Sequence, residues 1–195
     1  AGRMAQGPWP RPCIAEMGGK NAVVVSRRAD LARAATGIVR SAFGLQGQKC
    51  SACSRVYVER DVGAELRARM IEATRAISVG DPTRREHWMG PVINQAAFDR
   101  YGRCVSQLRQ HGRVLVGGEP LNTGDRARGW FVAPTIGEAA FDYRLWREEK
   151  FIPLVLVGDV DSVDEGIDRA NESPFGLTAG FYGAVDEIEP FLERI

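Results

Sequence analysis

Short runs of β-branched and aromatic residues alternate along this chain with longer segments of helical periodicity, and that alternation narrows the possible folds more than any other feature. The runs predict buried strands near residues 22–25, 55–58, 113–116, 154–157 and 177–182. Apolar residues at 3.6-residue spacing predict helices at 31–43, 62–76, 95–111, 163–171 and 185–195. Strands that alternate with helices are typical of α/β domains, so we expect an open, mostly parallel sheet flanked by helices.

Residues at the ends of these segments support the assignment. Asp30 precedes the first helix and is a good N-cap, because its carboxylate can accept hydrogen bonds from the first free N–H groups. Around Pro134 the sequence predicts only short extended pieces, at 130–132 and 135–136. Residues 1–13 are rich in proline and glycine, which predicts a leading loop or truncated linker before a single domain at 14–195.

The charge balance excludes some kinds of partner. The chain has 26 basic and 25 acidic residues, for a net charge of +1, which gives no electrostatic footprint for nucleic acid or an anionic membrane. No apolar run reaches the roughly 20 residues that a membrane-spanning helix needs. We therefore expect neither a nucleic-acid partner nor a membrane partner.

The cysteines are too sparse for a disulfide scaffold. The chain has four of them, Cys13, Cys50, Cys53 and Cys104. Its two histidines, His87 and His111, show no metal-ligand spacing to these cysteines, so we expect no metal site. A reducing cytoplasm is the expected location.

Cys50 is the first candidate for chemistry. It follows Gly44 and Gly47, two positions where the chain can adopt positive φ, and it precedes a predicted strand. A thiol on such a turn can face a substrate while its own backbone N–H points the same way, and that N–H is half of an oxyanion hole. The alternative is a small buried core residue, as free cysteines usually are.

Glu16 is the second candidate. It stands just before Gly18-Gly19, a turn at which the backbone can approach another group closely, and it has apolar neighbours. A carboxylate buried there would be tuned toward proton transfer near neutral pH, which suits a general base. An exposed glutamate at a strand edge is an equally good interpretation of the local sequence.

Together, these segments resemble the aldehyde dehydrogenase family. Residues 16–21 (EMGGKN) resemble its general-base motif, and residues 47–50 (GQKC) resemble its nucleophile motif 34 positions later, the separation usual in the family. Residues 148–153 (EEKFIP) resemble its E-E-x-F-G-P segment. Further matches in the same order lie at 89–93, 133–135 and 171–178. Residues 43–52 are most similar to the branch that oxidises glutamate semialdehyde (Δ1-pyrroline-5-carboxylate).

The resemblance implies a role for each motif. Cys50 would attack a small aldehyde, which in that branch is a semialdehyde, and Glu16 would activate the water that releases the acid. NAD or NADP would accept the hydride. Glu149 would bind the hydroxyls of the nicotinamide ribose, Phe151 would pack against that end of the cofactor, and Gly18 would leave room for it. Lys20 and Asn21 would be structural and fix the turn that carries Glu16.

Two departures from the family pattern affect these expectations. Ile152 replaces the usual glycine after Phe151, where a side chain could crowd the cofactor or shift the ring. The family's glycine-rich, cofactor-binding domain normally precedes the Glu16 motif, and this chain has no G-x-G-x-x-G sequence. We therefore expect the catalytic domain alone, with little activity by itself, from a homo-oligomeric parent.

Other functions remain open on the sequence. A CoA-acylating relative would resolve the thioester with a thiol, but such members generally lack the base that Glu16 represents. A non-catalytic relative of the fold would be a structural or binding module. A cysteine hydrolase would need His87 or His111 beside Cys50, and no sequence feature places either residue there.

Overall fold

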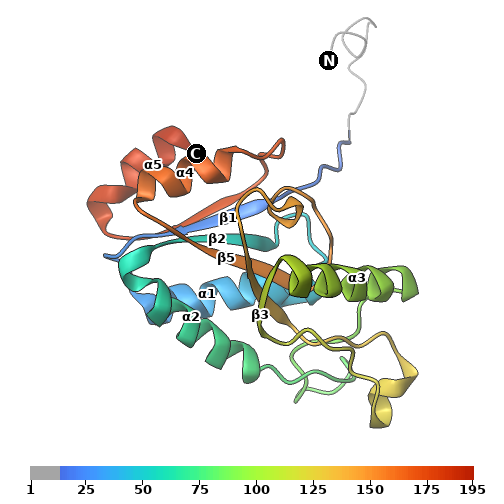
Figure 1. Cartoon of the computed structure of the whole chain (residues 1–195). Coiled ribbons are helices and arrows are strands. Elements are labelled where there is room, and N and C mark those ends of the chain that lie inside the picture. The colour runs from blue at the N-terminus through green and yellow to red at the C-terminus, as the bar shows by residue number, and fades with distance from the viewer. Residues whose placement is uncertain (1–13) are drawn as a thin grey trace, which may run out of the picture.

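A central sheet organises the structure, a computed structural model that describes residues 14–195 (Figure 1). Within these residues six strands pair in the order β3-β4-β5-β2-β1-β6. All neighbours run parallel except β3 and β4, which are antiparallel. The strands are β1 Asn21–Val25, β2 Cys53–Glu59, β3 Gly112–Val116, β4 Thr135–Ala139, β5 Leu154–Val160 and β6 Ala179–Tyr182. This confirms the expected open, mostly parallel sheet.

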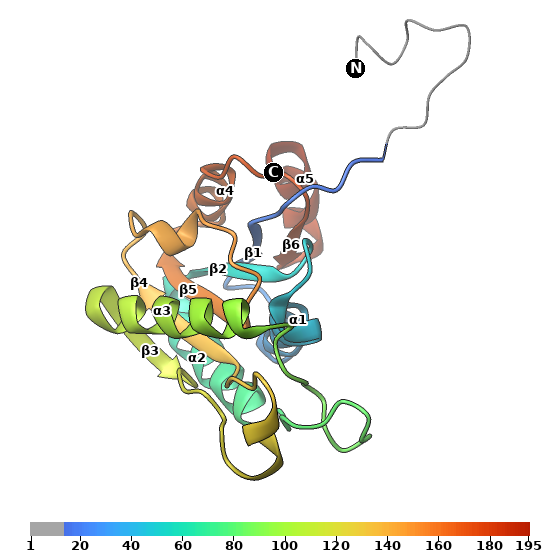
Figure 2. The same cartoon turned by 90° about the vertical axis from the view of Figure 1, so that its right-hand side faces the viewer.

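Helices cover both faces of the sheet. Figure 1 shows α4 and α5 on one side of β1 and β2 and α1 and α2 on the other, and Figure 2 shows α3 alongside β3 and β4. The helices are α1 Leu31–Phe43, α2 Arg60–Arg75, α3 Gln95–His111, α4 Val163–Asn171 and α5 Ile188–Arg194. None of these helices, within the described part of the chain, is long and apolar enough to cross a membrane.

The valine run of β1 explains the three layers. Successive side chains of a strand point to opposite faces. Val23 and Val25 accordingly pack in the core cluster beneath α1 and α2, whereas Ala22 and Val24 pack in the cluster on the α4 side. Because both faces are buried, the strand is apolar throughout rather than alternating.

Local signals account for the helix starts. The Asp30 carboxylate accepts hydrogen bonds from the N–H groups of Ala32 and Arg33, at 3.0 and 3.1 Å. The Asn94 side chain caps α3 by accepting from the Ala97 N–H at 3.0 Å. These caps satisfy N–H groups that have no partner inside the helix, and α1 has the expected bounds, 31–43.

Two segments differ from expectation. The expected helix at 185–195 is instead a 3₁₀ turn, Val185–Glu187, followed by α5. In a continuous α-helix, Pro190 would lack the N–H that bonds to the carbonyl of Asp186, and its ring would clash with that carbonyl. The extended pieces near Pro134 become a full strand, β4. Its residues Thr135–Gly137 pair with β5, a long-range contact that overrides the weak local preference.

The adjacent strands β1, β2 and β5 are parallel, so their amino ends lie side by side at the same end of the sheet. The three segments that carry the predicted site residues come immediately before them, at 16–20, 47–50 and 149–151. The predicted site therefore lies at the amino ends of the strands. Open α/β sheets more often bind ligands at the carboxyl ends.

Candidate active site

The turn that carries Cys50 has an unusual backbone. A 3₁₀ turn, Gly44–Gly47, follows α1, and Leu45, Gln46 and Gly47 have φ values of 51°, 59° and 66°. A left-handed conformation costs a non-glycine residue about 1–2 kcal/mol. Gly44, which we expected to have positive φ, has φ −55°. The strain therefore falls on the two non-glycine residues between the glycines.

Long-range contacts hold this turn in place. The Gln48 side chain accepts a hydrogen bond from the Ile93 N–H at 3.0 Å. A Cβ atom on Gly47 would collide with the carbonyl oxygen of Ile152, so only glycine allows this approach. Ile152 itself is 4% exposed and lies in the core cluster. Its side chain is therefore part of the core, and Ile152 lines the same small cavity as Phe151.

Asn21, at the start of β1, fastens the Cys50 turn to the sheet. Its side-chain amide donates to the carbonyl oxygens of Cys50 at 2.7 Å and Ala52 at 2.9 Å. Its side-chain oxygen accepts from the Thr178 N–H at 3.1 Å. Asn21 is thus structural, as expected, but it fixes the Cys50 turn rather than the turn that carries Glu16. No local pattern could reveal this contact, because it spans 29 residues.

The turn before β1 packs directly on the turn before β2. A Cβ atom on Gly19 would collide with the carbonyl oxygen of Cys50. At the start of the sheet, Asn21 pairs with Cys53 and Ala22 pairs with Arg55, which leaves Ser54 as the extra residue of a β-bulge. The two motifs that the sequence predicted to be partners are therefore in backbone contact.

Cys50 differs from the other described cysteines in its surroundings. It is a free, half-buried thiol, and its backbone N–H donates no hydrogen bond to residues 14–195. Cys53 is 3% exposed, and burial raises the pKa of its thiol to about 12. Burial also raises the pKa of the Cys104 thiol. Cys53 is therefore the small buried residue that the sequence predicted.

Glu149 completes the contact among the three segments. Its Oε1 accepts a hydrogen bond from the Gly19 N–H at 2.7 Å. A Cβ atom on Gly18 would lie 2.5 Å from its Oε2, so the missing side chain provides the space for this carboxylate. Phe151 follows with φ 50° and is 37% exposed. The structure thus brings together Gly18 and Glu149, with the Phe151 ring open to solvent.

Glu16 is the predicted site residue that lies apart from the contact among the other three segments. We considered that its apolar neighbours would bury it, but it is exposed, as are Ile14 at 90% and Met17 at 65%. Of the two interpretations that the sequence left open, the exposed glutamate is therefore the one found, because nothing within residues 14–195 covers the segment. Its side chain makes no hydrogen bond or ion pair with that part of the chain.

The space between the three turns is small. A cavity of about 20 Å³, close to the size of a single water site, is lined by Gly19, Gly47, Glu149 and Phe151 among others. Within the described residues no group of three or more His, Cys, Asp or Glu side chains is placed to hold a metal ion. His87 contacts the Asp81 carbonyl and His111 packs on Tyr143, so neither contact supports the cysteine hydrolase.

Comparison with known proteins shows the same family throughout. The aldehyde dehydrogenase family profile matches residues 4–195. The chain is 44% identical over 171 residues to a 1-pyrroline-5-carboxylate dehydrogenase of Bacillus mycoides (strain KBAB4), and 42% identical over 171 residues to one of Geobacillus kaustophilus (strain HTA426). Each alignment covers 87% of this chain and 32% of the relative. The chain thus spans about a third of the length of these relatives.

Solved structures agree with the sequence relatives. A 1-pyrroline-5-carboxylate dehydrogenase from Thermus with bound NAD superposes with a TM-score of 0.85 at 32% identity, over 92% of this chain and 34% of that one. A betaine aldehyde dehydrogenase from Staphylococcus aureus in complex with NAD⁺ gives a TM-score of 0.89 at 25% identity, over 92% and 36%. Because the family profile matches nearly every residue, the chain belongs to the aldehyde dehydrogenase family.

Proposed function

We propose that this chain carries the catalytic domain of an NAD(P)⁺-dependent aldehyde dehydrogenase, which oxidises a semialdehyde to the carboxylic acid with Cys50 as nucleophile. The observation that carries the proposal is the contact of three motifs at the amino ends of adjacent strands. Gly19 touches the Cys50 carbonyl and donates to Glu149. A structural module would not need a half-buried thiol, a free N–H and a carboxylate on three segments that meet at Gly19.

The residues near Glu149 fit a nicotinamide cofactor. Oε1 of Glu149 is occupied by the Gly19 N–H, while Oε2 lies over Gly18 with no hydrogen bond to residues 14–195. That oxygen is free to accept a hydrogen bond from a ribose hydroxyl, and the exposed Phe151 ring offers an apolar face beside it. When bound, a nicotinamide supplies the hydride acceptor that oxidation of an aldehyde requires.

The roles of the chain's own groups follow from their placement. The Cys50 thiolate adds to the aldehyde carbon, and the resulting oxyanion accepts a hydrogen bond from the Cys50 N–H. After oxidation of this adduct to a thioester, Glu16 takes a proton from the water that attacks the acyl carbon, and the thiolate leaves. Glu16 is exposed here, so we propose that another part of the full-length parent covers its segment and completes the site.

The substrate class rests on the relatives. Two of them are 1-pyrroline-5-carboxylate dehydrogenases at 42–44% identity, and residues 43–52 resemble the same branch. We therefore propose glutamate semialdehyde as the first aldehyde to test. The presence of Glu16 favours hydrolysis over transfer to CoA.

The test compares the full-length parent with its Cys50→Ala and Cys53→Ala variants. Reduction of NAD⁺ by the semialdehyde should fall on the order of a thousandfold or more in Cys50→Ala and stay measurable in Cys53→Ala, because only the first removes the nucleophile. Retained activity in Cys50→Ala contradicts the proposed role. Acyl-CoA formation in the presence of CoA would identify the acylating alternative, and an inactive but folded parent would identify a binding module.

A further inference from the structure

A buried arginine joins the turn before β1 to a helix more than a hundred residues away. Arg55 is the third residue of β2 and is 3% exposed. Its guanidinium donates four hydrogen bonds, three of them to backbone carbonyl oxygens and one to a tyrosine hydroxyl. None of these bonds goes to Cys50, Glu149 or Phe151, so any effect of Arg55 on the candidate active site is indirect.

On one side, Arg55 holds the turn before β1. Its Nε donates to the carbonyl oxygen of Lys20 at 2.8 Å, and Lys20 directly follows Gly19. The regular pairing of β1 with β2 is interrupted at this point, because Ser54 is the extra residue of the β-bulge. The arginine side chain therefore fastens the turn to the sheet where the ladder is irregular.

On the other side, Arg55 caps the end of α4. Its Nη2 donates to the carbonyl oxygen of Ala170 at 3.0 Å, and its Nη1 donates to that of Arg169 at 3.3 Å. The last carbonyl groups of a helix have no acceptor role inside the helix, and the negative end of the helix dipole favours a cation there. The guanidinium thus satisfies two carbonyl groups at the last turn of α4.

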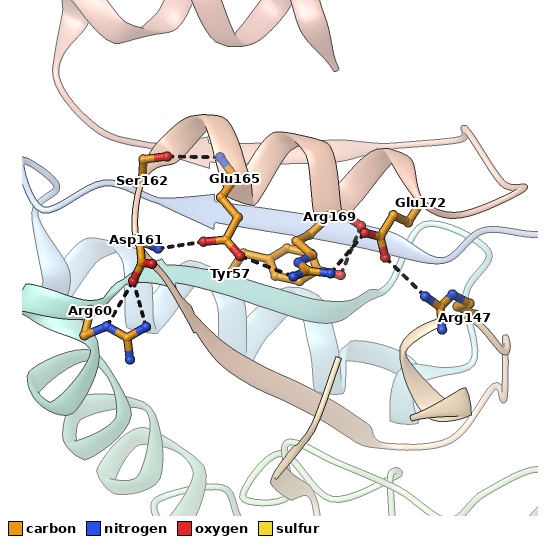
Figure 3. Close-up of polar contacts among 8 residues, drawn as sticks. All are labelled: Tyr57, Arg60, Arg147, Asp161, Ser162, Glu165, Arg169 and Glu172. Atoms are coloured by element: carbon orange, nitrogen blue, oxygen red, sulfur yellow. Dashed lines mark hydrogen bonds and ion pairs between the residues drawn. The ribbon is translucent and has the colours of Figure 1, made fainter. Parts of the chain in front are cut away.

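The end of α4 is itself held in place, as Figure 3 shows. The Arg169 side chain pairs with Glu165 at 3.4 Å and with Glu172 at 3.1 Å, and Glu172 also pairs with Arg147 at 3.2 Å. The Tyr57 hydroxyl donates to the Arg169 carbonyl at 3.3 Å. The ion pairs are partly exposed and each contributes little, but together they give Arg55 a fixed point of attachment.

The held turn is the one that orients the Glu149 carboxylate. The Gly19 N–H donates to Oε1 of Glu149 at 2.7 Å. A shift of about 1 Å in the turn would stretch this bond beyond the usual range of about 2.7–3.2 Å. We propose that Arg55 is a positioning residue for the cofactor, which ties the Gly19 turn to the end of α4 and thereby fixes the N–H that orients Glu149. This inference rests on the proposed function, because it takes Glu149 as a ligand of NAD⁺.

Arg55→Lys in the full-length parent tests this role. Lysine keeps the positive charge, but its single ammonium cannot reproduce the planar fork that reaches Lys20 on one side and Ala170 on the other. Calorimetric titration with NAD⁺ should show binding about tenfold weaker than in the unaltered parent, the effect of one lost hydrogen bond to a charged group. The KM for NAD⁺ should rise with the Kd, and the KM for the semialdehyde should not change.

A double-mutant cycle separates positioning from a general loss of structure. If Arg55 acts through Glu149, Arg55→Lys should weaken NAD⁺ binding by less than about twofold in a Glu149→Ala background. Tyr57→Phe is the matched control, because it removes contacts with Arg55 and the Arg169 carbonyl but none with Lys20, and it should leave the Kd for NAD⁺ unchanged. Equal weakening in both backgrounds, or in both Arg55→Lys and Tyr57→Phe, would overturn the inference.

Hydrogen exchange in the unaltered parent decides the matter even if Arg55→Lys does not fold. Saturating NAD⁺ should slow amide exchange in the peptide that carries Gly19 and also in the peptide that covers the end of α4, because Arg55 joins the two. Peptides from α2 should exchange at the same rate with and without NAD⁺. Slowing at Gly19 without slowing at the end of α4 contradicts the inference.

The binding measurements also distinguish this inference from the proposed function. A parent that binds no NAD⁺ overturns the proposed function, and the role of Arg55 with it. A parent that binds NAD⁺ with the same affinity before and after Arg55→Lys overturns the role of Arg55 alone. Loss of activity in Cys50→Ala does not enter either result, because Cys50 makes no hydrogen bond with Arg55.

Discussion

Replacing Asn21 with alanine should loosen the turn that carries Cys50 more than any other single polar deletion near it. The Asn21 side chain is buried and makes three hydrogen bonds, two to the Cys50 and Ala52 carbonyls and one from the Thr178 N–H. Alanine makes none of them. Three backbone groups would be left without a partner in a site that water reaches only in part.

The expected magnitude follows from these three groups. A buried polar group that loses its partner costs about 1–3 kcal/mol. The Cys50 carbonyl is partly accessible and can bind a water molecule in the vacated space, so the cost for this group is at the low end of that range. We expect Asn21→Ala to lower the free energy of unfolding by about 3 kcal/mol, a large part of the 5–15 kcal/mol typical of a domain.

Urea unfolding followed by circular dichroism measures this change. With a slope of about 2 kcal/mol per molar urea, the midpoint should fall by about 1.5 M. Asn171→Ala is the matched control, because Asn171 makes one exposed hydrogen bond, to the Arg194 carbonyl, and should change the stability by less than about 1 kcal/mol. If the two variants unfold at the same urea concentration, Asn21 does not fasten the turn and the reasoning is wrong.

Three further predictions concern the same region. Gly47→Ala should lower the free energy of unfolding by at least about 2 kcal/mol, because Gly47 has φ 66° and a Cβ would meet the Ile152 carbonyl. Gly44→Ala, at φ −55°, should lower it by less than about 0.5 kcal/mol. Both changes are measured by urea titration, and equal effects would contradict the strained turn. The free energy of unfolding should rise by up to about 1.4 kcal/mol per pH unit from pH 7 to pH 8.5, because folded Lys20 releases its proton near pH 7 while unfolded lysine keeps it to about 10.5. Below pH 7 both states hold the proton and the slope vanishes; a slope that persists in Lys20→Met would argue against this cause. Maleimide should modify Cys50 at least about tenfold faster than Cys53 or Cys104 in the folded chain, since the latter two are buried with raised pKa values, and peptide mapping that finds equal rates would count against the assignment.

Helices were predictable wherever their signals are local. Asp30 and the apolar periodicity of 31–43 lie next to one another in the sequence, so the bounds of α1 follow directly from them. β4 was not predictable as a strand, because Gly137 and Pro134 weaken its local preference and its pairing with β5 supplies the stability. Pro190 shows that one residue can turn the start of a predicted helix into a 3₁₀ turn, so that α5 begins at Ile188.

The candidate site was predictable in its components but not in its geometry. The glycines and Cys50 indicated a turn, yet the positive φ values of Leu45 and Gln46 depend on contacts with residues far along the chain. The roles of Asn21 and of the Gly19–Glu149 hydrogen bond depend on strand order, which the sequence pattern leaves open. The exposure of Glu16 depends on what covers it, and no pattern within the segment carries that information.

The pairing of β1 with β2 sets the separation of the Gly19 and Cys50 turns in discrete steps. A slip of one residue would move Gly19 by about 3.3 Å along the strand and turn Asn21 to the opposite face of the sheet. The valines on both faces of β1 oppose such a slip, because it would exchange the two core clusters. The distance between the two turns therefore cannot drift gradually as the core changes. Only the conformation of the turns can adjust this distance finely. The register itself is selected by the core side chains of β1, which lie away from the candidate active site.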